Sequence, residues 1–266
     1  MKGKVALVTG STSGIGLAIA RTLAARGCHI MLNGFFPAQA GQTPDQQGQA
    51  LVAAMQEEFG VRVAYSAADL SDPEAIAGML SGTVEQLGAV DILVNNAGIQ
   101  HTAPVEEFTT TQWDRIIAIN LSAAFHTIHH AIPHMQRQRW GRIVNIASVH
   151  GLVGSLHKSA YVAAKHGIVG LTKVVALENA ANGITANAIC PGWVSTELIK
   201  RQIEDIVERE GTSFEQAQHD LVTAKQPLPN MTSTEQIGEW VAFLCTEAAG
   251  TTTGATLAVD GGWTSQ

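Results

Sequence analysis

The stretch KVALVTGSTSGIGLAIARTLAARG (residues 4–27) joins three kinds of sequence in a row. It begins with a short apolar run, which predicts a buried strand over residues 4–9. It ends with apolar residues at helical spacing, which predict a helix over residues 15–27 that stops at Gly27. A glycine-rich turn separates the two. The stretch therefore predicts one strand–turn–helix unit of an α/β fold.

The turn itself, TGSTSGIG, carries Gly10, Gly14 and Gly16. Glycine permits a positive φ and a close approach of backbone to a diphosphate, and the N terminus of the following helix offers free N–H groups. The spacing is G-x3-G-x-G and not the commoner G-x-G-x-x-G. No Lys-Ser/Thr pair follows, which excludes a P-loop, and Thr12 stands where a nucleophile elbow needs serine. The turn therefore predicts a dinucleotide site.

The rest of the chain repeats the alternation of apolar and amphipathic runs. Further strands are predicted at residues 29–34, 62–68, 91–98, 141–148, 184–192 and 256–262. Helices are predicted near residues 48–59, 73–87, 112–136, 159–181 and 234–246. Strands that are apolar throughout and separated by helices are typical of a parallel sheet with both faces covered. We expect one α/β domain over residues 1–266, with a Rossmann-like, doubly wound, seven-stranded parallel sheet.

Two segments interrupt this alternation. Residues 35–49 are rich in Gln, Pro and Gly and predict a surface loop. Residues 195–230 form a long, charged, helical excursion between the last two predicted strands. Ligands of such sheets bind at the carboxyl ends of the strands, so this insertion is placed to act as a substrate lid. A solvated pair of surface helices is the alternative interpretation.

Composition narrows the range of partners. The chain has 266 residues, of which 45% are hydrophobic and 15% charged, and its formal net charge is −7. An acidic balance argues against nucleic acid and anionic membranes as partners, so we expect neither. An anionic substrate would need a local cationic pocket. Cys28, Cys190 and Cys245 are far apart and suggest neither disulfides nor zinc, and no signal peptide or membrane span is evident, so we expect a soluble, cytoplasmic protein.

Polar residues at predicted strand ends indicate how a dinucleotide would bind. The second strand ends in Asn33-Gly34-Phe35-Phe36, where an acidic side chain commonly holds the ribose of NAD and a basic one suits a 2′-phosphate. Neither is present. Because nothing cationic is there to bind a 2′-phosphate, NAD is the expected cofactor, with Phe35 against the adenosine. Asp69, at the end of the third strand, is either a helix N-cap or an adenine contact.

A possible proton-transfer group follows the fifth strand. Ser148 closes that strand, Tyr161 comes thirteen residues later, and Lys165 lies four residues beyond. Residues four apart share one face of a helix, and a nearby ammonium favours the phenolate of a tyrosine. Tyrosine could then act as a general base or acid. Alone, the Tyr–Lys spacing is common and predicts no more than a surface pair. Combined with the glycine turn it indicates a catalytic site.

Taken together, these motifs resemble the classical short-chain dehydrogenase/reductase family along essentially the whole chain. TGSTSGIG, NNAG (95–98), Asn120 in IIAINLSAAF, Ser148, Tyr161, Lys165 and PGW (191–193) stand in the family's order. The resemblance implies a nicotinamide cofactor and a homotetramer. It implies that Tyr161 exchanges a proton with the substrate oxygen, Ser148 hydrogen-bonds that oxygen, and Asn120 supports a relay through water. Lys165 would hold the nicotinamide ribose and lower the pKa of Tyr161. The cofactor-binding residues so implied are Gly10, Thr12, Ser13, Gly14, Ile15, Gly16, Phe35, Asp69, Leu70, Asn96, Gly98, Tyr161, Lys165, Pro191, Gly192 and Val194.

A narrower resemblance is to the family's bacterial dehydrogenases of D-3-hydroxybutyrate. It rests on NNAGIQH, ASVHG, HKSAYVAAKHG, AICPGW, KQP and DGGWT. It implies oxidation of (R)-3-hydroxybutyrate to acetoacetate, with substrate residues Gln100, His150, Lys158, Trp193, Gln202 and Trp263. Cationic or donor groups suit the carboxylate, and tryptophans suit the methyl group. Val149 and His157 depart from the expected pattern and leave chain-length preference open. A different hydroxy acid, a sugar alcohol, or a non-enzymatic dinucleotide sensor remain alternatives.

A row of histidines has metal-ligand spacing on the predicted helix over residues 112–136. His126, His130 and His134 share one face, and His129 lies beside them. No cysteine or carboxylate joins them, so we expect no bound metal. This helix is one that the family uses for contact between subunits.

Overall fold

Seven parallel strands form one sheet in the computed structural model, which describes residues 1–36 and 43–265. They are β1 (Val5–Val8), β2 (His29–Asn33), β3 (Val63–Ser66), β4 (Ile92–Asn95), β5 (Gly141–Ile146), β6 (Ile184–Pro191) and β7 (Thr256–Val259). Their order is β3-β2-β1-β4-β5-β6-β7, and every neighbouring pair is parallel. The chain changes direction across the sheet between β1 and β4, where ligands of doubly wound sheets bind. The predicted fold class is confirmed.

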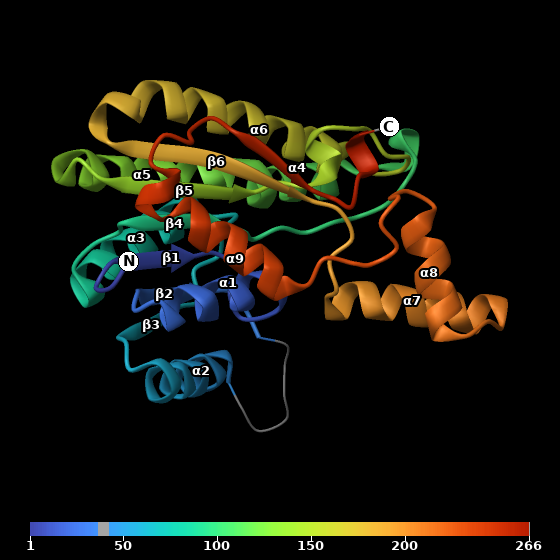
Figure 1. Ribbon diagram of the computed structural model, residues 1–266, viewed down its shortest axis with the longest axis horizontal. Coiled ribbons are helices and arrows are strands. Elements are labelled where there is room, and N and C mark those ends of the chain that lie inside the picture. Colours follow the sequence, from blue (N-terminus) through green and yellow to red (C-terminus); the bar gives the residue numbers. More distant parts are fainter. Residues whose placement is uncertain (37–42, 266) are drawn as a thin grey trace.

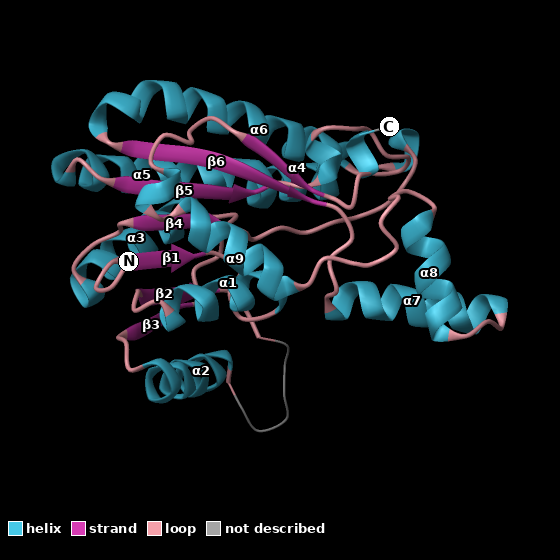
Figure 2. Ribbon diagram, viewed as in Figure 1, coloured by secondary structure: helices cyan, strands magenta, loops and turns pink. Residues whose placement is uncertain are grey.

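Helices cover both faces of this sheet (Figures 1 and 2). They are α1 (Gly14–Ala25), α2 (Pro44–Phe59), α3 (Pro73–Leu87), α4 (Thr110–Ile117), α5 (Ala123–Gln138), α6 (Ser159–Asn179), α7 (Glu197–Glu210), α8 (Phe214–Thr223) and α9 (Thr234–Leu244). Side chains alternate along each strand, so Ala6 and Val8 face one core while Val5 and Leu7 face the other. The first core lies against α1, α2 and α9, and the second against α3, α5 and α6.

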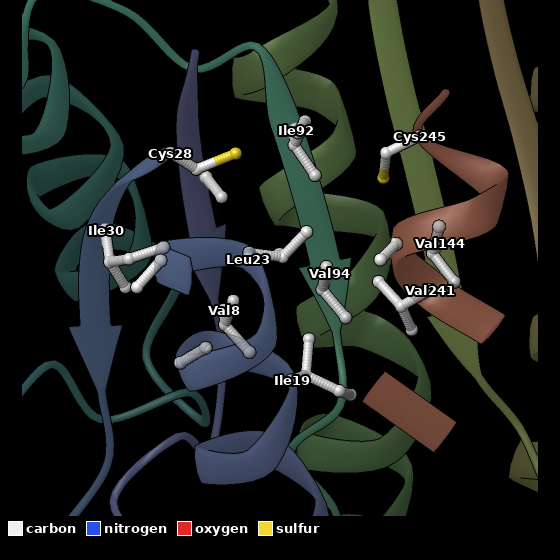
Figure 3. Close-up of a cluster of buried hydrophobic side chains, with 14 of the residues drawn as sticks. Val8, Ile19, Leu23, Cys28, Ile30, Ile92, Val94, Val144, Val241 and Cys245 are labelled. Atoms are coloured by element: carbon white, nitrogen blue, oxygen red, sulfur yellow. The ribbon is translucent and has the colours of Figure 1, made fainter. Parts of the chain in front are cut away.

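The core beneath α1 and α9 fixes the glycine turn relative to the sheet. Figure 3 shows Leu23 of α1, Val241 of α9 and Val94 of β4 packed together. Leu23 and Val241 are completely buried. Burying a side chain of this size stabilises a fold by about 1.5–3 kcal/mol. Apolar packing thus holds the N terminus of α1 at the carboxyl end of β1.

Two predicted helices differ from those observed. Residues 37–42 of the expected loop lie outside the described residues, but α2 begins at Pro44, four residues before the expected start. Thr43 and Gln46 form a capping box there, and Pro44 takes the first helical position. The helix expected over residues 112–136 is divided, because a π-helical turn, η2 (Ala118–Ser122), separates α4 from α5. Such turns are frequent at functional sites.

The excursion predicted over residues 195–230 contains α7 and α8. Figure 1 shows both helices apart from the sheet, on the side toward which the strands point. Ile203 of α7 and both Ala217 and Val222 of α8 are buried. The pair therefore has an apolar interior of its own, and its action as a lid remains a prediction.

In the described part of the chain, one helix is long and apolar enough to cross a membrane by length and composition. It spans residues 159–182, and 44% of its apolar window is buried inside the structure. Ile168 and Val175 of this helix belong to the cores beside the sheet. The apolar side of α6 is thus used in packing within the protein.

Candidate active site

The glycine turn is closed by asparagine and threonine side chains. Asn96 Nδ2 donates to the carbonyls of Thr9 at 2.9 Å and Gly10 at 3.1 Å, and Thr9 Oγ1 accepts from the backbone N–H of Asn96 at 2.9 Å. A Cβ at Gly16 would overlap the Gly10 carbonyl oxygen and lie 2.5 Å from Asn96 Nδ2. Gly16 is therefore required by packing within the turn. Asn96 holds the turn in place, whereas the sequence predicted only a contact with the cofactor.

The first turn of α1 can receive an anion. Ser13 occupies the N-cap with extended backbone, and its side chain makes no capping hydrogen bond. Gly10 and Gly14 have φ of +62° and +53°, a region that favours glycine. The N–H groups of the first turn and the positive end of the helix dipole suit a diphosphate. The residues present thus fit the diphosphate of a dinucleotide.

At the end of β2, Asn33 is fully buried and serves the fold. Its Nδ2 donates to the carbonyls of Ser66 at 3.2 Å and Ala68 at 3.1 Å, and its Oδ1 accepts from Gly10 N at 3.4 Å. Thr12 Oγ1 donates to the Phe35 carbonyl at 3.0 Å. The Phe35 side chain is 59% exposed, so it is accessible to a ligand.

Asp69 does not cap the helix that follows it. The N-cap of α3 is Asp72, which accepts a hydrogen bond from Glu74 N at 2.9 Å. Asp69 accepts instead from Ser71 N and Ser71 Oγ, both at 2.8 Å, and these bonds lower the pKa of its carboxyl. The N-cap interpretation was therefore wrong. The neighbouring Leu70 side chain is buried in the core.

Ser148, Tyr161 and Lys165 come together in the structure; the spacing predicted the Tyr161–Lys165 pair, and the resemblance implied Ser148 beside it. Ser148 lies just beyond β5, and its Oγ accepts from His150 N at 3.2 Å. Lys165 is 3% exposed and donates to the Ile146 carbonyl at 2.8 Å. Its Nζ lies 5.6 Å from the centre of the Tyr161 ring. Strand end and helix face thus place a hydroxyl, a phenol and an ammonium side by side.

Burial governs the titration of two of these groups. It lowers the pKa of Lys165 to about 8. The Tyr161 ring keeps some exposure, yet protein atoms surround its hydroxyl, so burial raises the pKa, opposed by a hydrogen bond from Ser148. The resemblance implies that Lys165 lowers the pKa of Tyr161. In the structure burial is the larger effect, and the Lys165 ammonium is bonded to a backbone carbonyl.

The π-helical turn directs Asn120 into the interior. Its Nδ2 donates to the Ile99 carbonyl and its Oδ1 accepts from Ile99 N, both at 2.9 Å. Asn120 is 2% exposed and lies 3.6 Å from the position of a Cβ on Gly98. A cavity of about 10 Å³ lies beside Asn120 and Thr9, close to the minimum space that one water needs.

A buried polar network beneath the site escaped prediction. Asn95 Nδ2 donates to Asn145 Oδ1 at 2.9 Å, and Asn145 Nδ2 donates to Thr172 Oγ1 at 2.8 Å. Thr127 Oγ1 donates to Asn95 Oδ1 at 2.6 Å. The bonds tie β4 and β5 to α5 and α6. Asn95 thus serves this interior network, although it belongs to the NNAG motif.

Aromatic rings cluster beside Tyr161. The His150 ring lies 6.2 Å from Tyr161 and 5.6 Å from Trp263, edge-on to both. Trp263 in turn lies 5.8 Å from Trp193. Three of the residues implied for substrate binding therefore form one cluster, which contacts Tyr161 through His150.

The charge of this cluster comes from lysines. Burial lowers the pKa of His150 to about 4, with Lys158, His166 and Lys225 acting in the same direction. His150 is thus neutral near pH 7, and its Nδ1 has no hydrogen-bond partner among the described residues. Lys158 stands at the N-cap of α6, and burial lowers its pKa. Lys225, in the KQP segment, is a further cation that the sequence did not single out.

Two residues implied for the substrate do not join this cluster. Gln100 follows β4 and Gln202 lies on α7, and both side chains are exposed. Neither makes a hydrogen bond to the cluster within the described residues. Their roles remain predictions. Pro191 ends β6, Gly192 follows it, and Val194 pairs with Thr232.

The histidines of α5 pack on an exposed phenylalanine. The rings of His129 and His126 lie 5.9 and 5.3 Å from Phe125, and His130 contacts His129 at 5.0 Å. In the part of the chain that the structure describes, no group of three or more His, Cys, Asp or Glu residues could hold a metal ion.

Comparisons with known proteins give consistent matches over this chain. A profile of short chain dehydrogenases matches residues 4–206. D-beta-hydroxybutyrate dehydrogenase of Cupriavidus necator is 52% identical over 100% of both chains, and that of Rhizobium meliloti is 48% identical over 99% of both. Among solved structures, L-sorbose reductase of Gluconobacter frateurii, complexed with NADPH and L-sorbose, has a TM-score of 0.92 and 28% identity, with 100% of this chain and 98% of that chain covered.

Proposed function

Because this chain belongs to the short-chain dehydrogenase family and is an oxidoreductase, we propose that it oxidises (R)-3-hydroxybutyrate to acetoacetate reversibly, with NAD as cofactor. The proposed substrate is supported chiefly by the cluster of His150, Trp263 and Trp193 beside Tyr161, for which Lys158 supplies a positive charge. The two relatives named as D-beta-hydroxybutyrate dehydrogenases support the same substrate.

The nicotinamide supplies the hydride acceptor. Tyr161, as phenolate, takes the proton of the substrate hydroxyl, while the carbon that bears this hydroxyl gives up its hydride. The products are a ketone and the protonated phenol. Ser148 Oγ donates to the substrate oxygen and steadies it. Lys165 keeps a positive charge beside the phenol. The raised pKa of Tyr161 implies that oxidation becomes faster as the pH rises, because more phenolate forms.

In this proposal, different residues contact the carboxylate end and the methyl end of the substrate. Lys158 provides the charge for the carboxylate, and neutral His150 provides a hydrogen bond through a ring nitrogen. Trp193 and Trp263 enclose the methyl group and exclude water. Gln100 and Gln202 add neutral donors when the α7–α8 pair closes over the site.

NAD is favoured over NADP by what surrounds the end of β2. Asn33 is committed to backbone bonds, and neither Gly34 nor Phe35 bears a charge that could bind a 2′-phosphate. L-sorbose reductase, which shares this fold, was solved with NADPH, so a preference for NADP over NAD is the alternative. The two cofactors therefore belong in one comparison.

NAD(P)H formation with a panel of alcohols tests the function. The panel holds both enantiomers of 3-hydroxybutyrate, a longer 3-hydroxy acid and a sugar alcohol, each with NAD and with NADP. The highest kcat/KM is expected for the (R) enantiomer with NAD. A preference for the sugar alcohol or for NADP would overturn the corresponding part of the proposal, and no turnover at all would favour a dinucleotide sensor.

A further inference from the structure

The segment Lys225-Gln226-Pro227 connects the end of α8 to the extended return toward α9, and Gln226 is its buried member. Gln226 is 2% exposed. Its Nε2 donates to the carbonyl of Leu228 and to that of Asn230, both at 3.0 Å. One amide therefore fixes the path of the chain as it leaves the helical pair.

The same amide is packed between two glycines from distant parts of the chain. A Cβ on Gly192 would lie 3.1 Å from Gln226 Oε1. A Cβ on Gly261 would lie 2.9 Å from both Cδ and Nε2 of Gln226. Gly261 thus admits Gln226 because it lacks a side chain, and Gly192 for the same reason admits both Gln226 and the Asp260 backbone. The end of β6, the exit from α8 and the C-terminal turn meet at this point.

Each glycine stands next to a tryptophan of the aromatic cluster. Trp193 directly follows Gly192, and its carbonyl accepts from Thr232 N at 2.9 Å. Trp263 lies two residues after Gly261, whose carbonyl accepts from Leu228 N at 3.0 Å. The segment held by Gln226 is therefore hydrogen-bonded to the backbone of Trp193 and to that of Gly261, two residues before Trp263.

The C-terminal turn is rigid within itself. Asp260 accepts hydrogen bonds from Gly262 N at 3.0 Å, from Thr264 N at 2.9 Å and from Thr264 Oγ1 at 2.6 Å. A shift of Gly261 would consequently move the turn as a unit, with Trp263 on it. Gln226 packs directly on that glycine.

Both ends of the α7–α8 pair are attached at this place. The entry is held by the pairing of Val194 with Thr232 and by Ser195 N donating to the Thr232 carbonyl at 2.9 Å. The exit is held by Gln226. Movement of the pair would therefore be transmitted to the two tryptophans.

We propose that Gln226 is a positioning residue of the substrate pocket, which sets Trp193 and Trp263 against His150 at the base of the helical pair. The proposal rests on the proposed function in one respect, namely that these tryptophans line the pocket for the hydroxy acid. Gln226 acts through them, and its Oε1 has no hydrogen-bond partner among the described residues.

Gln226→Met tests this, because methionine keeps the volume of glutamine but donates no hydrogen bond. Losing two hydrogen bonds that orient the pocket should raise the KM for (R)-3-hydroxybutyrate about tenfold. We expect kcat and the KM for NAD to stay within about twofold, because the proton-transfer group and the glycine turn are untouched. Gln216→Met, at an exposed position of α8, is the matched control and should behave as wild type.

Hydrogen exchange of the protein without substrate gives a second readout. The amides of Leu228, Trp263 and Thr264 should exchange faster in Gln226→Met and at the wild-type rate in Gln216→Met. Should Gln226→Met fail to fold, Gln226→Asn, whose shorter amide retains donors but cannot reach both carbonyls, should show the same changes to a smaller degree.

Two results would overturn the proposal: unchanged exchange and KM in both Gln226 variants, or a parallel loss of thermal stability, kcat and both KM values, which marks a general structural role. Were the wild type to oxidise no hydroxy acid, the proposed function would fail separately, and the exchange rates would decide the positioning role.

Discussion

Burial keeps His150 neutral beside Tyr161, so the positive charge near this aromatic cluster lies on lysines. His150 is 7% exposed, and burial and nearby cations both favour its uncharged form. A neutral imidazole can donate one hydrogen bond and accept another, but it does not attract an anion from a distance. We therefore expect selection of an acid over a neutral alcohol to depend on Lys158, with Lys225 as a second cation acting on His150.

The titration of His150 links pH to stability. Its pKa falls from 6.5 to about 4 on folding, so between these values the unfolded chain binds a proton that the folded chain does not. The free energy of unfolding consequently decreases as the pH drops from 6.5 toward 4, by on the order of 3 kcal/mol, and is restored above 6.5. His150→Gln, which takes up no proton, should lack this component in urea unfolding. The same pH dependence in both proteins would contradict the assignment.

Among single residues, spacing predicted those that share a local element. Tyr161 and Lys165 share a helix face, so their proximity follows from the helical period. Ser148 closes a strand, and its place beside Tyr161 was implied by the family resemblance. Gln226 has no such signal, because its partners Gly192 and Gly261 are brought to it only by the fold. For Asp69 the sequence suggested adenine binding or an N-cap; its bonds to Ser71 are local, and the sequence did not show that Asp72, and not Asp69, caps α3.

Strands and helices were predicted correctly where apolar runs were long. The ends of helices were predicted wrongly where local side-chain and backbone bonds decide where a helix begins or is interrupted. Because Thr43 forms a capping box, α2 begins before its predicted start. The π-helical turn divides the helix that was predicted over residues 112–136. The network through Asn95 and Asn145 was missed because its two asparagines lie on different strands. Hydrogen bonds between strands leave no local pattern in a sequence.

That network should contribute measurably to stability. Asn145→Leu keeps the branched shape of the side chain but leaves Asn95 Nδ2 without its acceptor, while Thr172 Oγ1 loses one donor and still donates to the Ile168 carbonyl. A buried polar group left unpaired costs about 1–3 kcal/mol, so we expect a loss of that order in urea unfolding. The Asn95→Leu/Asn145→Leu double variant should lose less than the sum of the single losses. Strictly additive losses would show that the two asparagines do not act together.

For the molecule as a whole, the parallel sheet and its two helical layers followed from the alternation of strands and helices, whereas the order of the strands came from the structure. The homotetramer stays a prediction. Phe125 on α5 and Val174 and Leu177 on α6 are 50%, 51% and 83% exposed, a pattern compatible with contact between subunits. The action of α7 and α8 as a lid likewise stays a prediction, attached to the sheet at the site of Gln226.

We propose that this family fold, with its general proton-transfer group, selects a short hydroxy acid through the positive charge of Lys158. The most direct test measures kcat/KM with NAD for (R)-3-hydroxybutyrate and for its methyl ester, in which a methyl group caps the carboxylate and removes its charge. The wild type should prefer the acid by about tenfold to a hundredfold, the range expected for a charge-assisted hydrogen bond. Lys158→Ala should lose this preference, while Lys173→Ala, an exposed lysine of the same helix, should retain it. Equal oxidation of acid and ester by the wild type, or a preference for the acid that survives in Lys158→Ala, would contradict selection of the acid by Lys158.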